Sequence, residues 1–238
     1  MHDREVTMTE NADPGAAASS ADETQTIYTA YEIDFMLNLR RTEAAEITRE
    51  QIGIRSAPEQ AADFVSAAVA AGLRARGKVE QSADGQWLLG REGQIVAGTL
   101  TSANRWLGMA LAQGGAMRMA FLVAAEQSVL MLTQDELDTF LVTALASPDQ
   151  VPQAVTDIAR AFLAQAPGNT VSLRRCDAGD PATTTQLMLH VEDDGAWKVG
   201  HEPLTEEDVL QVSDISSEQV LPVVAELWAD GVSAAPHA

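Results

Sequence analysis

The middle of the chain contains three apolar runs separated by short turns, a pattern typical of a β-meander. Apolar runs flank two short turns, Gly114-Gly115 and Glu126-Gln127, and they predict three strands at residues 105–113, 117–125 and 128–132. Thr133 and Glu136 then have the spacing of a helix capping box, which predicts a helix through residue 145. This stretch therefore predicts a meander followed by a helix.

The chain before the meander has helical periodicity. Ser56, Pro58 and Glu59 form a helix start signal, and Gly77 marks the end of that helix. Its predicted apolar stripe consists of Phe64, Val65, Ala68, Val69 and Leu73. Weaker patterns predict a helix over 28–39, a short helix over 48–52, and a short strand at 87–89 followed by a helix.

The second half of the chain follows a similar order. Ser147, Pro148 and Gln150 predict the start of a helix that ends near Pro167-Gly168. Three strands are predicted at 170–176, 184–192 and 196–201. The middle strand alternates, with Leu187, Leu189 and Val191 on one face and Gln186, Met188, His190 and Glu192 on the other. An acidic helix over 204–214 and a helix beginning at Ser216, with Gln219 at the capping-box position, complete the pattern.

The order of capped helix, three-stranded antiparallel meander and capped helix thus occurs twice. A three-stranded sheet cannot bury both of its faces alone, so we expect an α/β (α+β) fold in which two similar halves pack together with pseudo-twofold symmetry. The halves are residues 26–146 and 147–230. Residues 1–25 are small, polar and acidic and predict a disordered tail, and residues 231–238 predict a frayed C-terminus.

Composition narrows the classes of partner. A formal net charge of −20 repels nucleic acid and anionic membrane surfaces. The sequence has no apolar run long enough to cross a membrane, no basic-then-apolar signal pattern at its start, and one cysteine, Cys176, which cannot form an internal disulfide. These features indicate a cytoplasmic protein that is not inserted in a membrane.

The search for reactive groups yields weak candidates. Phosphate-loop, dinucleotide-binding and nucleophile-elbow motifs are absent, so we predict no catalytic residue, no cofactor and no enzyme activity. Cys176 has no neighbouring base in the sequence, which favours a structural or surface thiol. His190 and His201 lie on adjacent predicted strands near Glu192 and Glu202. They form a candidate metal site, although solvent-facing histidines are the more frequent interpretation, and no metal is predicted.

Two acidic clusters remain, at residues 192–194 and 206–208. A hairpin tip and a helix N-terminus account for them more simply than a cation site does. Residues 201–238 contain eight acidic residues and no lysine or arginine, so this region faces either a basic partner or solvent.

A winged-helix DNA-binding protein is the alternative interpretation. Residues 28–104 predict helices, then GLRARGKV, then a wing-like DGQWLL. The would-be recognition helix has Glu59 and Asp63 near its start and its basic residues, Arg74 and Arg76, only at its end. A DNA-binding surface needs phosphate neutralisation across its footprint, so this pattern and the net charge disfavour nucleic acid.

The runs APEQAADFVSAAVAAGLRARGKV and RWLGMALAQGGAMRMAFLVAAEQSVLMLTQDELDTFLVTAL resemble the EspG family of actinobacterial type VII (ESX) secretion. The shared pattern is an early helix ending in an LRARG-like turn, a meander leading into a helix, and a second half with the same plan. It covers residues 26–230.

The resemblance implies a non-enzymatic cytoplasmic chaperone with two quasi-twofold subdomains. Such a chaperone would bind the helical tip of secreted substrate proteins, typically PE–PPE heterodimers, keep them soluble and target them to the secretion system. The resemblance assigns no contact residue, and the sequence leaves a homodimer open.

Overall fold

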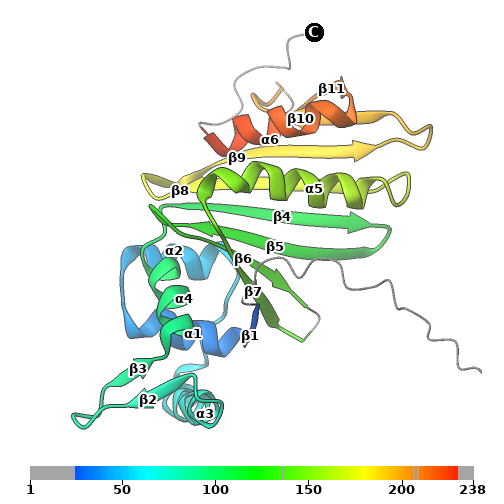
Figure 1. Ribbon diagram of the computed structural model, residues 1–238. Helices are drawn as coiled ribbons and strands as arrows, with labels where there is room; N and C mark the ends of the chain where they lie inside the picture. The colour runs from blue at the N-terminus through cyan, green and yellow to red at the C-terminus, as the bar shows by residue number, and fades with distance from the viewer. Residues whose placement is uncertain (1–24, 136, 206, 208, 230–238) are drawn as a thin grey trace, which may run out of the picture.

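A computed structural model describes residues 25–229 except 136, 206 and 208. Within this part the chain forms one nine-stranded sheet, a separate two-stranded hairpin and six α-helices (Figure 1). The mixed α/β fold with a large antiparallel sheet is as predicted. The predictions for the two tails concern residues outside this part, apart from residue 25. None of the described helices is both long and apolar enough to span a bilayer.

The sheet is built outward from a central pair of strands, β4 and β8. Its order is β1-β7-β6-β5-β4-β8-β9-β10-β11, with every neighbouring pair antiparallel. The strands are β1 (Thr26–Thr29), β4 (Arg105–Gln113), β5 (Ala116–Ala124), β6 (Val129–Gln134), β7 (Thr139–Leu145), β8 (Thr170–Asp177), β9 (Asp180–Val191), β10 (Trp197–His201) and β11 (Gln211–Ile215). Each predicted meander therefore has a fourth strand, and the two meanders form a single continuous sheet.

The helix predicted over residues 133–145 is wrong, because this segment is a hairpin. Thr133 lies in β6, and the Asp135 carboxylate accepts the backbone N–H groups of Leu137 and Thr139, each at 2.9 Å. Asp138 adopts a positive φ of 53°, which closes the turn. The β-branched and aromatic residues of TFLVTAL then pair with β6, and this long-range pairing overrides the local capping-box spacing.

Two other helix predictions also need correction. The acidic helix predicted over 204–214 does not form in the described residues, and residues 211–215 pair with β10 as the edge strand β11. The predicted helix over 28–39 begins two residues later, after β1. There Thr29 and Glu32 form the capping box of α1, with the Thr29 N–H donating to the Glu32 carboxylate at 2.9 Å.

The helices cover opposite faces of the sheet. The first group is α1 (Ala30–Leu39), α2 (Glu43–Gln51), α3 (Ala62–Ala75) and α4 (Arg91–Thr101), with the hairpin of β2 (Val79–Gln81) and β3 (Trp87–Leu89). The second group is α5 (Val151–Leu163) and α6 (Val220–Ala229). Trp106 of β4 packs with the first group, whereas the adjacent Leu107 packs with the second. Four strands that are consecutive in the chain lie on each side of the β4–β8 contact, and β1 adds a ninth strand beside β7. The helices are divided unequally between the two faces.

The helix α3 buries much less of its surface than its sequence predicts. Ser56 does not cap it, because the Ser56 hydroxyl donates to Asp34 at 3.1 Å and a 3-10 turn at Glu59–Ala61 precedes the helix. Ala70 and Leu73 are buried, while Phe64 is 78% exposed. The predicted stripe is therefore only partly buried, with Val65 and Val69 half-buried and Ala68 exposed like Phe64.

Phe64→Ala is expected to change the free energy of unfolding by less than about 0.5 kcal/mol, because the ring contributes little to the core. Chemical denaturation of the variant and the wild type measures the difference. A loss of more than about 2 kcal/mol, in the range of a buried aromatic residue, would show that α3 packs through the predicted stripe.

Candidate functional site

One face of the second half of the sheet is left uncovered by the described helices. The helices α5 and α6 lie across the other face of β8–β10, in front of the sheet in Figure 1. On the uncovered side only the C-terminal end of α2 reaches the border, through Glu50 and Gln51. We call this surface the open face. The residues that define it are Gly108, Ala110, Met119, Phe121, Ser172, Arg174, Gln186, Met188, His190, Lys198, Gly200 and Val212, with Leu204, Val209 and Leu210 at the rim.

The open face contains two adjoining hollows of about 470 and 700 Å³, which share Gln186, Met188 and Leu210. Met188 is 40% exposed and Val212 is 69% exposed, with further exposed apolar side chains at the rim. A Cβ on Gly200 would lie 3.3 Å from the Cβ of Leu210, so glycine lets the β10–β11 connection fold over the strand. Contiguous exposed apolar residues rimmed by polar ones are typical of a protein-binding surface.

Charged groups on the open face are mostly paired with each other. The Lys198 ammonium donates to Asp214 at 2.5 Å, and this hydrogen bond and the charge of Asp214 raise the pKa of Lys198. Nε2 of His190 lies 3.9 Å from a carboxylate oxygen of Glu192. Nδ1 of His190 lies 3.1 Å from the carbonyl oxygen of Asn169 and 2.9 Å from the hydroxyl of Thr170. These contacts pair the charged groups on the β9–β11 side of the open face.

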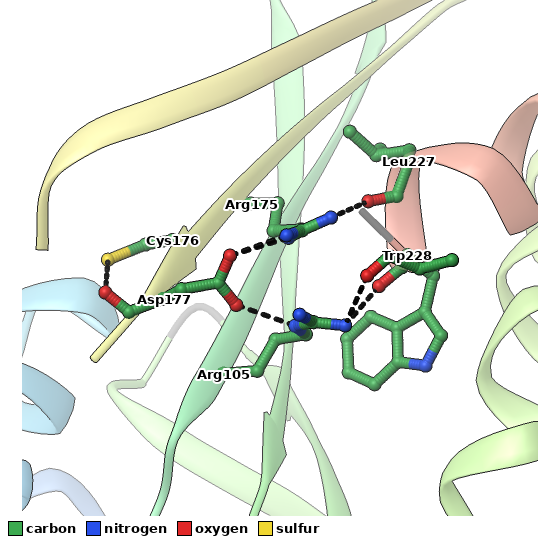
Figure 2. A network of polar contacts seen from close by, with 7 residues as sticks. Arg105, Arg175, Cys176, Asp177, Leu227 and Trp228 are labelled. Carbon is green, nitrogen blue, oxygen red and sulfur yellow. Dashed lines mark hydrogen bonds and ion pairs between the residues drawn. The ribbon is translucent and has the colours of Figure 1, made fainter. Parts of the chain in front are cut away.

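On the opposite face, two arginines attach the end of α6 to the sheet (Figure 2). The Arg175 guanidinium donates to the Leu227 carbonyl at 2.6 Å, and that of Arg105 donates to the carbonyls of Trp228 and Ala229. Asp177 joins the two, accepting from Arg105 at 2.6 Å and from Arg175 at 2.6 Å. The last carbonyls of a helix lack intrahelical partners, so this network satisfies them with positive charge.

The Asp177 carboxylate is the centre of this network. Burial opposes its ionisation, but the hydrogen bonds from Arg175 and Arg105 and their charges outweigh burial and lower the pKa of Asp177. The network thereby fixes α6 on the covered face and leaves the open face free of it.

The candidate reactive residues do not converge. Cys176 is buried in the core beside Trp106, and burial followed by the charge of Asp177 raises the pKa of its thiol. His190 pairs with Lys198 on the open face, whereas His201 pairs with Leu187 on the covered face. The two histidines therefore point to opposite sides of the sheet, and the metal-site hypothesis for this pair is wrong. In the described part of the chain, no group of three or more His, Cys, Asp or Glu side chains could hold a metal ion.

The acidic cluster at 192–194 forms the tip of the β9–β10 hairpin. The Asp194 carboxylate accepts the Ala196 N–H at 2.9 Å, and Gly195 has a positive φ of 87°. In the second cluster, Glu206 and Asp208 lie outside the described residues, and the N–H of Glu207 donates to the Thr205 hydroxyl at 3.3 Å. The Glu202 carboxylate accepts the Gln186 N–H at 3.1 Å, which links the β10–β11 connection to β9.

Part of the positive charge of the winged-helix alternative is paired within the protein. At the end of α3, Arg76 pairs with Glu32, and Lys78 pairs with Glu92 at 2.6 Å. The β2–β3 hairpin does follow α3, as a wing would. With Arg76 and Lys78 paired, Arg74 is left as a single exposed arginine at the end of α3, which is less positive charge than a DNA footprint needs.

The sequence pattern predicts no partner-binding residues, although it contains one signal for the open face. Met188 lies on the polar side of the strand pattern at 184–192, between Gln186 and His190. From the sequence alone, an apolar residue at this position indicates a strand face that a helix covers. Met188 indicates a binding surface only once the fold shows that no described helix packs on this face.

Comparison with known proteins gives a match of fold and no match of sequence. No family model and no curated protein sequence matches the chain. Among solved structures, it is similar to the type VII secretion system chaperone EspG5 of Mycobacterium tuberculosis, whose structure was determined in complex with the PE25–PPE41 dimer. The TM-score is 0.52 at 11% sequence identity, over 88% of this chain and 99% of the other. The chain thus has a fold that is distantly similar to that of an EspG chaperone.

Proposed function

We propose that this protein is a non-enzymatic cytoplasmic chaperone of a type VII secretion system. Its clients would be helical secreted proteins of the PE–PPE kind, which it keeps soluble and delivers to the secretion apparatus. The observation that carries the proposal is the similarity of fold to EspG5, a chaperone whose structure was determined in complex with a PE–PPE dimer, over most of both chains. We propose the open face as the surface that binds the client.

The dimensions of the open face fit the tip of a helical client. The two hollows extend across six strands, from β5 to β11. Strands are spaced about 4.8 Å apart, so the surface is roughly 24 Å wide. Two packed helices have axes about 8–10 Å apart and are each about 10 Å across, so a two-helix tip is roughly 20 Å wide.

The mechanism is masking of apolar surface. A helical tip that is apolar in solution associates with other copies because association removes it from water. Contact with Met188, Val212 and the rim residues removes the same surface from water and therefore competes with self-association. The strongly negative charge of the chaperone keeps the complex soluble.

Met188→Arg is expected to weaken client binding at least about 30-fold, because it places an unpaired charge in the centre of the apolar surface. The experiment is co-expression of the chain with PE–PPE pairs from its own genome, followed by purification and titration calorimetry. The matched control is Ile27→Arg. Ile27 is an exposed apolar strand residue (58%), but it lies at the other end of the sheet and on the opposite face.

The possible outcomes test the proposed function and the proposed binding surface separately. Failure of the wild-type chain to bind any PE–PPE pair contradicts the proposed function. Equal weakening by Met188→Arg and Ile27→Arg, or by neither, contradicts the open face as the binding surface. If the isolated chain is a dimer that Met188→Arg converts to a monomer, the open face is instead an interface between two copies.

A further inference from the structure

We infer that Arg174 recognises a carboxylate, an Asp or Glu side chain, on the protein that docks on the open face. The inference rests on the proposed function and adds a chemical requirement for the client. The open face has three basic side chains, His190, Lys198 and Arg174. Lys198 pairs with Asp214, and His190 lies 3.9 Å from Glu192. Among the described residues, no carboxylate lies within 4 Å of the Arg174 guanidinium.

The sheet places Arg174 in the middle of the surface. Its strand, β8, lies between β4 and β9, and its register partners are Gly108 and Gln186. Gly108 has no side chain, so this position of β4 does not cover the arginine. A Cβ added there would lie 3.9 Å from its nearest neighbours, the Arg174 carbonyl oxygen and Cδ1 of Phe121. Ala110 and Ser172 are the next pair along the same two strands and are also small. A partner can therefore approach the guanidinium from the hollow.

Charge makes this position selective. The chain as a whole carries −20 and repels acidic partners at long range. An acidic group is therefore favoured only where a local positive group meets it directly. A guanidinium presents donors in a planar fork that matches a carboxylate with two parallel hydrogen bonds, and a lysine or histidine does not. Glu50 lines the same hollow, but its carboxylate is not within ion-pair distance of Arg174. Its negative charge repels a client carboxylate that does not contact Arg174 directly.

The part of the client that docks on the open face therefore combines two features. It has apolar side chains that contact Met188 and Phe121, and it has one carboxylate that contacts Arg174. The apolar contacts provide most of the affinity, and the carboxylate fixes orientation and selects among clients that are equally apolar.

The test uses the full chain and the PE–PPE heterodimers of its own genome. Arg174→Gln is expected to raise Kd about 10-fold, because it removes a charged hydrogen-bond pair. Arg174→Glu is expected to raise it at least about 100-fold, and Arg174→Lys less than Arg174→Gln, since a lysine keeps the charge but loses the fork. The matched control is Arg118→Glu, because Arg118 is an exposed arginine on β5 that lies on the opposite face, in register with Leu111. It is expected to leave Kd unchanged.

A charge swap identifies the partner atom. Each Asp and Glu of the client tip is changed to Lys, and one of these changes is expected to restore binding to the Arg174→Glu variant. Thermal unfolding of every Arg174 variant checks that the chaperone itself remains folded.

If Arg174→Gln and Arg174→Glu bind as tightly as the wild type while Met188→Arg does not bind, the inference is overturned and the proposed function stands. Weakening that no client substitution restores also overturns the carboxylate, since the acceptor is then a backbone carbonyl. If the wild-type chain binds no PE–PPE pair, both the function and the inference are overturned.

Discussion

Trp106→Ala is expected to lower the free energy of unfolding by about 3–5 kcal/mol. Trp106 is 2% exposed and, among the described residues, has the largest fully buried side chain of the core between the sheet and the first helix group. Its indole N–H donates to the Thr48 hydroxyl at 2.9 Å, and that hydroxyl donates to the Leu100 carbonyl at 2.8 Å. The substitution therefore opens a cavity and removes one member of a hydrogen-bond chain that joins β4, α2 and α4. Urea denaturation of the wild type and the variant measures the loss.

Trp106→Phe separates the two contributions. The smaller ring keeps much of the packing but cannot donate a hydrogen bond, so it is expected to cost about 1–2 kcal/mol. Thr48→Val, which keeps the side-chain shape and removes the hydroxyl, is expected to cost a similar amount because it leaves the indole N–H unpaired. A loss below about 1 kcal/mol for Trp106→Ala would contradict the placement of this residue between the sheet and α2.

Asp177→Asn is expected to lower the free energy of unfolding by about 2 kcal/mol near neutral pH. The substitution leaves the buried Arg175 and the partly buried Arg105 without their shared carboxylate. Removal of one partner of a fully buried ion pair costs about 3–5 kcal/mol. The value expected here is smaller because the Asp177 side chain is 35% exposed and solvent screens its charge. The pKa of Asp177 is lowered in the folded protein, so its ionised form stabilises the fold.

The contribution of Asp177 to the free energy of unfolding depends on pH. A lowered pKa means that the contribution of Asp177 is fully present above its unfolded pKa, about 3.9, and is lost as the pH falls through the lower folded value. The difference between wild type and variant is therefore largest above about pH 5 and shrinks in acid. Asp193→Asn, at the exposed tip of the β9–β10 hairpin, is the control and is expected to change the free energy of unfolding by less than about 0.5 kcal/mol. A pH-independent difference would contradict the role of the ionised carboxylate.

The elements that local sequence predicted well are those in which local and long-range preferences agree. The glycine pair at 114 and 115 marks the β4–β5 turn, and the alternation of Leu187, Leu189 and Val191 marks the covered face of β9. Ser216 and Gln219 form the predicted capping box before α6. In each case a few neighbouring residues contain the whole signal.

The failures occur where a distant strand competes with a local helix signal. Residues 139–145 and 211–215 lie in segments where a local pattern predicts a helix, but each joins the edge of a meander, where pairing satisfies its backbone groups. The stripe on α3 fails for a related reason. Its apolar residues are helical in period, but α3 contacts the rest of the protein along a narrow strip that includes Leu73 and excludes Phe64. The division of the chain into two similar halves, residues 26–146 and 147–230, stays a prediction.

The sequence by itself determined the strands of two meanders, the helices around them, the strong negative charge and the lack of recognisable catalytic motifs. Only the tertiary structure decided that the meanders join at β4 and β8 and that the helices cover opposite faces at the two ends. The physical reason is that periodicity records which side of a strand is apolar, whereas the covering of that side depends on segments far away in the chain. Met188 and Arg174 are adjacent to an open surface because no described helix packs there, and no local pattern carries that information.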